Sequence, residues 1–255
     1  MKDALRMEAH LFLLCLRYLT RVPMARDLAT SDDLRVRATK YQPLVGALVG
    51  AVGAAVLGLA GMVWSWPVAV LLSLGATLLV TGAFHEQGFA RSAEALAIGR
   101  DRMSVLRGLQ TSSYGRVGTL TLGLALALKL ALLMELPPGL AAVGLIAAHG
   151  IGRMAAVHVT ATTHYAREEG IRALVPGVTP DGYRAALATS GLLLAGLVAV
   201  TSLAAGLCAF LGAVALGQVW RMRAVAKMGG YTRDCLGGVE QLAELGVLLG
   251  LTVWV

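Results

Sequence analysis

Charged side chains are scarce in this sequence. Of its 255 residues only 15% are Asp, Glu, Lys or Arg, whereas 57% are hydrophobic and the mean hydropathy is +0.71. Soluble domains carry about 25% charged residues, so the composition excludes an ordinary water-soluble protein and indicates one that lies in a lipid bilayer. Aromatic residues are also few, at 5%. The basic residues that give the net charge of +7 are therefore not interleaved with aromatic side chains, as they are on a nucleic-acid surface. We expect no nucleic-acid partner.

Cysteine is equally sparse. The three cysteines, Cys15, Cys208 and Cys235, are an odd number without a CxxC pair, which excludes a disulfide framework. A Pro/Ser-rich linker and a shift in composition are absent as well, so we expect a single membrane domain over residues 1–255. An internal repeat is also lacking, which weighs against the inverted-repeat transporters.

What the sequence does contain is a series of long apolar runs. Crossing a hydrocarbon core about 30 Å thick takes about 20 apolar residues in a helix. On this measure the run over residues 185–216 is too long for one crossing and is divided near residues 201–206. The other predicted spans lie near residues 44–65, 67–84, 117–136, 139–161 and 236–255. The predicted fold class is all-α, a polytopic integral membrane bundle of about seven transmembrane helices.

An amphipathic helix is predicted before the first span. The apolar run at residues 11–16 is too short for a secretory signal and ends at Arg17. We expect this helix to lie along the membrane interface or against the bundle. Its apolar side would hold Leu5, Phe12, Cys15 and Leu19.

Basic residues predict how the chain is oriented. Nearly all of the 22 Lys and Arg residues fall in residues 1–43, 85–116, 162–184 and 221–235, and the intervening turns hold none. The positive-inside bias places these stretches in the cytoplasm. We therefore expect a multi-pass protein of the cell (inner) membrane, with its N-terminus and its active site on the cytoplasmic side.

Small and charged residues inside the spans predict how the helices pack. Gly46 and Gly50 have the small-xxx-small spacing that lets helix backbones approach, and Gly144, Ala148 and Gly152 repeat it. Arg153 needs a buried partner, which Glu240 or Glu244 could supply. Lys129 lies close enough to the end of its span to extend its amine to the interface, so we expect no role for it.

The first polar motif follows the second span, at residues 85–94, and reads HEQGFARSAE. Gln87, Arg91 and Glu94 are spaced i, i+4, i+7 and share one face of a helix. Carboxylates at a helix end can hold Mg²⁺ together with substrate phosphates, and Glu86 and Glu94 are the candidates here. The alternative is a solvated helix start with an Arg91–Glu94 ion pair.

Two further polar stretches lie on the same predicted side. The first stretch lies within residues 100–118 and has glycines before a helix, which let backbone N–H groups approach an anion. Ser112 and Arg116 would add donors suited to phosphate. The last stretch, residues 229–238, places Asp234 between glycines at the membrane boundary. Asp234 either belongs to a site for a metal ion or a phosphate, or caps the helix that follows.

Taken in order, these segments resemble those of the cobalamin synthase family, the adenosylcobinamide-GDP ribazoletransferases. Residues 85–94 are similar to the family pattern HxDGLADxxD, and residues 101–115 to DRExxLxxMxDSxxG. Residues 229–237 are similar to GGxTGDxLG, and residues 165–170 fit a further family loop. The resemblance covers nearly the whole chain.

The resemblance implies a Mg²⁺-dependent phosphotransferase of late cobalamin biosynthesis. A ribose hydroxyl of α-ribazole, or of its 5′-phosphate, would attack the diphosphate of adenosylcobinamide-GDP, and GMP would leave. The implied catalytic residues are His85, Glu86, Glu94 and Asp234, and the three carboxylates would bind Mg²⁺. His85 would act as a base, orient a carboxylate or serve a structural hydrogen bond. The implied substrate contacts are Gly88, Arg91, Arg100, Ser112, Gly115, Arg116, Arg167 and Thr232.

At three aspartate positions of the family pattern the sequence has a residue without a carboxylate. Gln87, Arg91 and Thr111 stand where the pattern has Asp. A cation at position 91 would repel Mg²⁺, so we expect weak metal binding and little transferase activity from the sequence as it stands.

Other functions stay open at this point. A non-catalytic membrane scaffold is favoured by the three departures, whereas a transporter is suggested only by the span count and the buried charges. A CDP-alcohol phosphotransferase is a weaker alternative, because residues 87–91 are similar to its DGxxAR element but lack the first Asp. The sequence also leaves a homo-oligomer open.

Overall fold

The computed structural model describes residues 2–24, 28–110, 113–166 and 176–254, and its regular elements within these ranges are helices. They are α1 (Lys2–Leu19), α2 (Asp32–Ala38), the 3₁₀ turn η1 (Thr39–Tyr41), α3 (Gln42–Gly61), α4 (Trp66–Thr81), α5 (Phe84–Ile98), α6 (Arg102–Gly108), α7 (Arg116–Glu135), α8 (Pro138–Thr162), α9 (Pro180–Val200), α10 (Leu203–Met228) and α11 (Arg233–Thr252). The predicted all-α fold class is confirmed.

Helix length and hydropathy agree with the predicted crossings. Six helical segments are long and apolar enough to span a membrane: the continuous run through α2 and α3, and the helices α7, α8, α9, α10 and α11. Helix α4 has only 16 residues, and together with α5 it forms a broken span bent by 88°. The total reaches seven when this bent pair counts as one crossing, and the division of the long 185–216 run into α9 and α10 is confirmed.

The second span ends earlier than the sequence predicts. Helix α4 stops at Thr81 because Gly82 takes a left-handed conformation with φ of 67°. Ala83 follows with φ of 53°, which for a residue with a side chain costs about 1–2 kcal/mol. The predicted limit at residue 84 is therefore wrong by one helical turn. The break turns the polar segment from residue 84 onward across the bundle instead of out of it.

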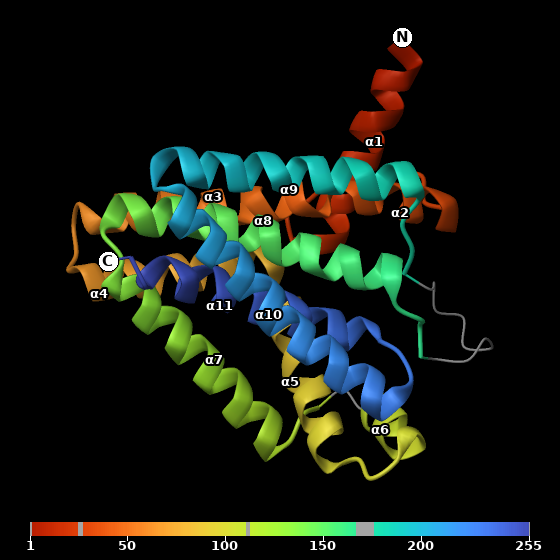
Figure 1. The fold of residues 1–255 in the computed structure, drawn as a ribbon. Coiled ribbons are helices and arrows are strands. Elements are labelled where there is room, and N and C mark those ends of the chain that lie inside the picture. Colours follow the sequence, from red (N-terminus) through yellow and green to blue (C-terminus); the bar gives the residue numbers. More distant parts are fainter. Residues whose placement is uncertain (1, 25–27, 111–112, 167–175, 255) are drawn as a thin grey trace.

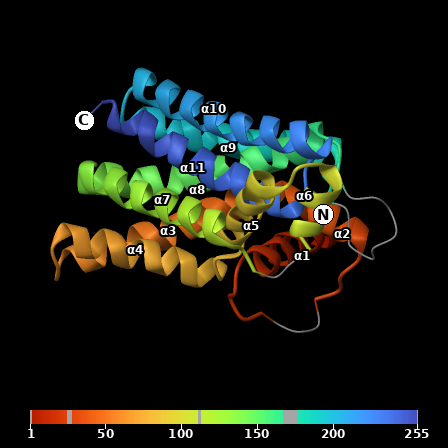
Figure 2. The ribbon, with the colours of Figure 1, turned by 90° about the horizontal axis from the view of Figure 1, so that it is seen from below.

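Helix α2, the segment from α5 through α6 and the turn between α10 and α11 lie at one end of the bundle (Figures 1 and 2). The short turns after α3, α7 and α9 lie at the opposite end, together with the C-terminus. This alternation of ends is the one expected from the distribution of basic residues.

Glycines allow the closest helix contacts. Gly46 and Gly50 on α3 face the backbone carbonyls of His149 and Leu145 on α8. Gly212 and Gly246 likewise bring α10 and α11 together. In a membrane, where lipid is as apolar as Leu, such close packing is a main source of helix association. The predicted small-xxx-small contact at Gly46 and Gly50 is thus confirmed.

Gly50→Ala should destabilise the bundle. The added Cβ would lie 2.5 Å from the Leu145 carbonyl oxygen, a backbone atom that cannot move alone. We expect a loss of about 1–3 kcal/mol, the usual cost of overpacking, measured as a lower midpoint of thermal unfolding in detergent. Gly58→Ala on the same helix is the control, since a Cβ there meets no atom within 4 Å. Equal midpoints for the two variants would contradict this packing.

Helix α1 packs against the bundle through its second half. Leu11, Leu14, Cys15 and Leu19 are buried with Val45 of α3 in a separate apolar cluster. The predicted apolar side is confirmed for Cys15 and Leu19 but is wrong for Leu5, which is 73% exposed. The reason is that the first turns of α1 extend beyond the other helices (Figure 1).

A polar clamp also fixes α1. The Glu8 carboxylate accepts a hydrogen bond of 2.6 Å from the Tyr41 hydroxyl and lies 2.5 Å from Lys40 Nζ. Hydrogen bonding to Lys40 and Tyr41 holds the pKa of Glu8 below its ordinary value. A lowered carboxyl pKa means that the clamp contributes above the unfolded-state pKa and is lost as the pH falls through the folded-state pKa.

Glu8→Ala should loosen α1. Because the pair is partly exposed, we expect a loss of about 0.2–1 kcal/mol, seen as faster amide hydrogen exchange over residues 2–19 at neutral pH. Acidification should produce the same change in the unmodified protein but not in the variant. Asp3→Ala, which removes only a fully exposed pair with Arg6, should leave the exchange unchanged. Unchanged exchange in Glu8→Ala would show that the clamp does not hold the helix.

Candidate functional site

The α5–α11 crossing brings together segments about 150 residues apart in the sequence. A Cβ on Gly88 would lie 3.1 Å from the Asp234 carbonyl oxygen, and Gly237 packs against the His85 carbonyl. The two glycines thus let the start of α5 lie directly on the start of α11. Helix α5 then has one buried face, with His85 and Glu86, and one outer face, with the exposed Gln87.

The outer face of α5 carries an ion pair. Arg91 Nη2 lies 3.0 Å from Asp234 Oδ1, and the two side chains are only 22% and 15% exposed. Glu94, one turn further, accepts a hydrogen bond of 2.7 Å from the Gly118 backbone N–H at the start of α7. Arg91 is therefore paired with Asp234, whereas the sequence left open a pair with Glu94.

The other predicted substrate contacts are dispersed over this end of the protein. Arg100 and Arg116 are exposed, and Gly115 lies against the Glu94 carboxylate. Thr232 is 1% exposed, and its hydroxyl donates to Cys235 Sγ at 3.4 Å. The described residues do not include Ser112 and Arg167, nor Thr111, which stands where the family pattern has Asp.

The carboxylates predicted to bind Mg²⁺ have separate partners. Glu86 is buried, and its Oε1 accepts a hydrogen bond of 3.1 Å from Gln241. Glu94 is bonded to Gly118 and Asp234 is paired with Arg91. Within the part of the chain that the structure describes, no group of three or more His, Cys, Asp or Glu side chains could hold a metal ion. The arrangement does not fit a resident Mg²⁺ ion held by these three residues.

A cavity of about 320 Å³ lies beside the crossing. Its wall is formed by α1, α2, the start of α5, α8 and the start of α11. His85 and Glu240 stand on this wall, as do Arg17, Arg35 and Arg233. None of the three arginines was among the predicted site residues. In the sequence, Arg17 and Arg35 belong to a basic stretch that indicates only membrane orientation.

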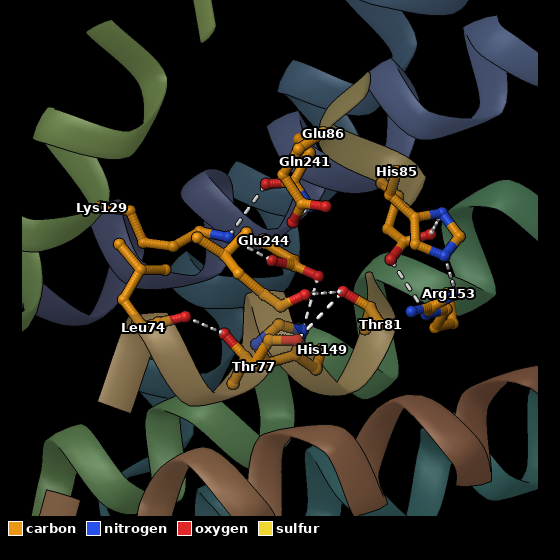
Figure 3. A network of polar contacts seen from close by, with 12 residues as sticks. Leu74, Thr77, Thr81, His85, Glu86, Lys129, His149, Arg153, Gln241 and Glu244 are labelled. Carbon is orange, nitrogen blue, oxygen red and sulfur yellow. Dashed lines mark hydrogen bonds and ion pairs between the residues drawn. The ribbon is translucent and has the colours of Figure 1, made fainter. Parts of the chain in front are cut away.

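His85 is held in a closed ring with Glu240 and Arg153. Figure 3 shows the side of this ring at which His85 and Arg153 meet. Arg153 Nη1 contacts His85 Nε2, and because a guanidinium only donates, Nε2 accepts and the ring proton of His85 is on Nδ1. Nδ1 lies 2.9 Å from Glu240 Oε2, and Arg153 Nε lies 2.9 Å from Glu240 Oε1. Both ring nitrogens are thus engaged, which favours an orienting role for His85 over that of a base. Glu240 is confirmed as the partner of Arg153.

A second buried network lies beside this ring (Figure 3). Lys129 Nζ lies 2.5 Å from Glu244 Oε2 and donates to Gln241 Oε1 at 3.0 Å, while His149 Nδ1 lies 2.8 Å from Glu244 Oε1. The expectation that Lys129 reaches the interface is wrong, because its side chain is only 2% exposed. It faces α11, where Glu244 and Gln241 supply the partners that the interface would otherwise provide.

Comparison with known proteins identifies the family. The family model described as cobalamin-5-phosphate synthase matches residues 11–252. The chain belongs to the cobalamin-5-phosphate synthase family. It is 37% identical to the adenosylcobinamide-GDP ribazoletransferase of Leptothrix cholodnii, over 97% of this chain and 96% of that protein. The protein of the same name from Ralstonia nicotianae is also 37% identical, over 100% and 99% of the two chains. No solved structure matches.

The structure places the departures from the pattern of the cobalamin-5-phosphate synthase family. Two of the three, Gln87 and Arg91, lie on the outer face of α5, and Arg91 is in contact with Asp234. A guanidinium thus takes the place beside Asp234 that a metal ion would need. The repulsion of Mg²⁺ expected from the sequence stays a prediction.

Proposed function

We propose that this chain is an adenosylcobinamide-GDP ribazoletransferase, which joins adenosylcobinamide-GDP to α-ribazole or its 5′-phosphate and releases GMP. The observation that carries the proposal is the similarity along nearly the full length to proteins of that name. A cavity with three arginines, at the polar end of an apolar helix bundle, supports it. Neither the comparisons nor the described residues add an observation in favour of a scaffold or a transporter.

The proposed reaction is a phosphoryl transfer. A ribose hydroxyl of the nucleoside attacks the phosphorus that carries the corrinoid, the bond from this phosphorus to the bridging oxygen breaks, and GMP leaves with that oxygen. The hydroxyl proton is released to solvent. Such reactions depend mainly on positioning and on neutralising phosphate charge.

The side chains of the cavity suit these two tasks. Arg17, Arg35 and Arg233 supply positive charge at the cavity wall. Glu240 can accept a hydrogen bond from the attacking hydroxyl, and Arg153 and His85 hold its carboxylate in place. Glu240 thereby orients the nucleophile. Arg153 and His85 act through Glu240 and are positioning residues.

The reaction is tested by single-turnover product formation. The protein in lipid nanodiscs, in excess over adenosylcobinamide-GDP, is mixed with α-ribazole, and the joined product is identified by its mass. Its appearance together with GMP supports the proposal. Glu240→Gln, which keeps the shape of the side chain, should slow product formation with little change in substrate affinity when equal amounts of folded protein are compared. Glu135→Ala at the opposite end of the bundle should leave product formation unchanged. Product absent even at saturating substrates and long times would contradict the function.

We also propose that the polar end faces the cytoplasm of a bacterial inner membrane, because the basic residues gather there. In intact cells, a membrane-impermeant thiol reagent should fail to label Met103→Cys in the exposed segment before α7 and should label Met62→Cys at the opposite end. The native cysteines are replaced by Ala for this measurement. Labelling with the reverse pattern would invert the proposed orientation.

A further inference from the structure

We infer that the cavity under α1 is the binding site of the acceptor, a nucleoside with a flat, apolar base, and that its arginines hold the 5′-phosphate of that nucleoside. The inference rests on the proposed function, which supplies two substrates of very different size. Three independent features of the cavity decide between them.

The first feature is size. At about 320 Å³ the cavity lies at the lower end of the range for ligand sites, about 300–1,000 Å³. This space suits a single nucleoside. A corrin ring with its amide side chains is far larger, so the corrinoid must remain outside the cavity with only its phosphates close to the wall.

The second feature is the apolar part of the wall. Leu14, Val36 and Leu236 contribute aliphatic side chains, and Tyr18 and Phe84 contribute two aromatic rings whose centroids are 6.1 Å apart. Phe84 is 41% exposed and Tyr18 51%, so their ring surfaces are open to a ligand. Flat bases stack on such rings, and aliphatic neighbours favour a base with few polar atoms.

The third feature is the arrangement of polar groups. Thr39, Gln42 and Thr160 offer hydrogen bonds to ribose hydroxyls, and Glu240 stands among the buried polar groups of the wall. Arg17 and Arg35 are exposed residues on two different helices, and Arg233 starts a third. Guanidinium groups from three helices around one opening suit the oxygens of a phosphate. A nucleoside 5′-phosphate satisfies the apolar wall, the hydroxyl partners and the arginines together.

The test is calorimetric binding of α-ribazole 5′-phosphate, α-ribazole and adenosylcobinamide-GDP, each measured separately on the full chain in phospholipid-free detergent. The Arg17→Ala/Arg35→Ala variant should weaken binding of the 5′-phosphate by at least about tenfold, since each charged hydrogen bond contributes about a factor of ten. Binding of α-ribazole should change little, and binding of adenosylcobinamide-GDP should fall less than that of the 5′-phosphate. Arg6→Ala/Arg37→Ala is the matched control, because it removes the same charge from the same two helices outside the cavity wall.

A second variant tests the cavity itself. Ala156→Leu fills space on the α8 side of the wall and should weaken both forms of the nucleoside, whereas Ala161→Leu on the exposed end of α8 should not. Nucleoside affinities that are unchanged in both cavity variants, or a loss confined to adenosylcobinamide-GDP, would overturn the assignment, as would absent nucleoside binding to the unmodified chain. If binding follows the expected pattern but no product forms, the transferase proposal fails and the assignment stands. If product forms with the same nucleoside KM in all variants, the assignment fails and the transferase proposal stands.

Discussion

Arg153→Met should be among the most destabilising single substitutions in this protein. The side chain is 1% exposed and is paired with Glu240, which is 2% exposed. Removing one partner of a buried ion pair leaves the other charge without compensation and costs about 3–5 kcal/mol. We expect a loss of this size in the free energy of unfolding, measured by denaturant titration of the protein in mixed micelles.

A second substitution separates this cause from a loss of packing. Glu240→Gln removes the remaining charge and keeps the shape of the side chain, so Arg153→Met/Glu240→Gln should recover most of the lost stability. Arg184→Met is the control, because its pair with Asp181 is largely exposed and should contribute little. A double variant as unstable as Arg153→Met would show that packing, and not the unpaired carboxylate, is responsible.

Gln87→Asp with Arg91→Asp should create a metal site. The two positions lie on the outer face of α5 with Glu94, and Arg91 contacts Asp234, so the double variant would gather four carboxylates at one place. At an effective dielectric of about 20, two unit charges about 4 Å apart interact by about 4 kcal/mol, and about 1.4 kcal/mol corresponds to tenfold in affinity. Replacing the cation by an anion should therefore raise the affinity for Mg²⁺ by roughly several hundredfold.

The affinity is measured by calorimetry with Mg²⁺ alone, so the result does not depend on turnover. Arg100→Asp with Gln110→Asp is the matched control: it makes the same change of charge on two exposed residues that follow α5. It should alter the affinity far less. Equal gains in the two variants would indicate a general effect of net charge, and no gain in either would mean that Asp234 and Glu94 do not form a metal platform.

The sequence predicts the membrane fold well because lipid imposes simple rules. Span length follows from bilayer thickness, and the alternation of ends follows from the placement of basic residues. The α3–α8 contact could be predicted as well, since Gly46 and Gly50 have few other reasons to stand four residues apart. The early end of α4 could not, because the left-handed conformation of Ala83 is imposed by its tertiary surroundings.

The candidate site is less predictable because it depends on which side chains face one another. The sequence indicates Glu240 or Glu244 as the partner of Arg153, since a buried arginine requires a carboxylate, and the structure has Glu240. The same reasoning applied to Lys129 would have found Glu244, but a lysine near the end of a span has the alternative of reaching water. The cavity arginines come from α1, α2 and α11, and no local pattern shows that these helix ends meet.

The most direct test of the account is the rate of GMP release from adenosylcobinamide-GDP by the purified protein in nanodiscs, with and without α-ribazole. We expect release that depends on the nucleoside, is slow in the unmodified chain and rises in Gln87→Asp/Arg91→Asp when Mg²⁺ is present. GMP release that is independent of the nucleoside, or absent from both proteins at saturating substrates, would contradict the proposed transfer reaction.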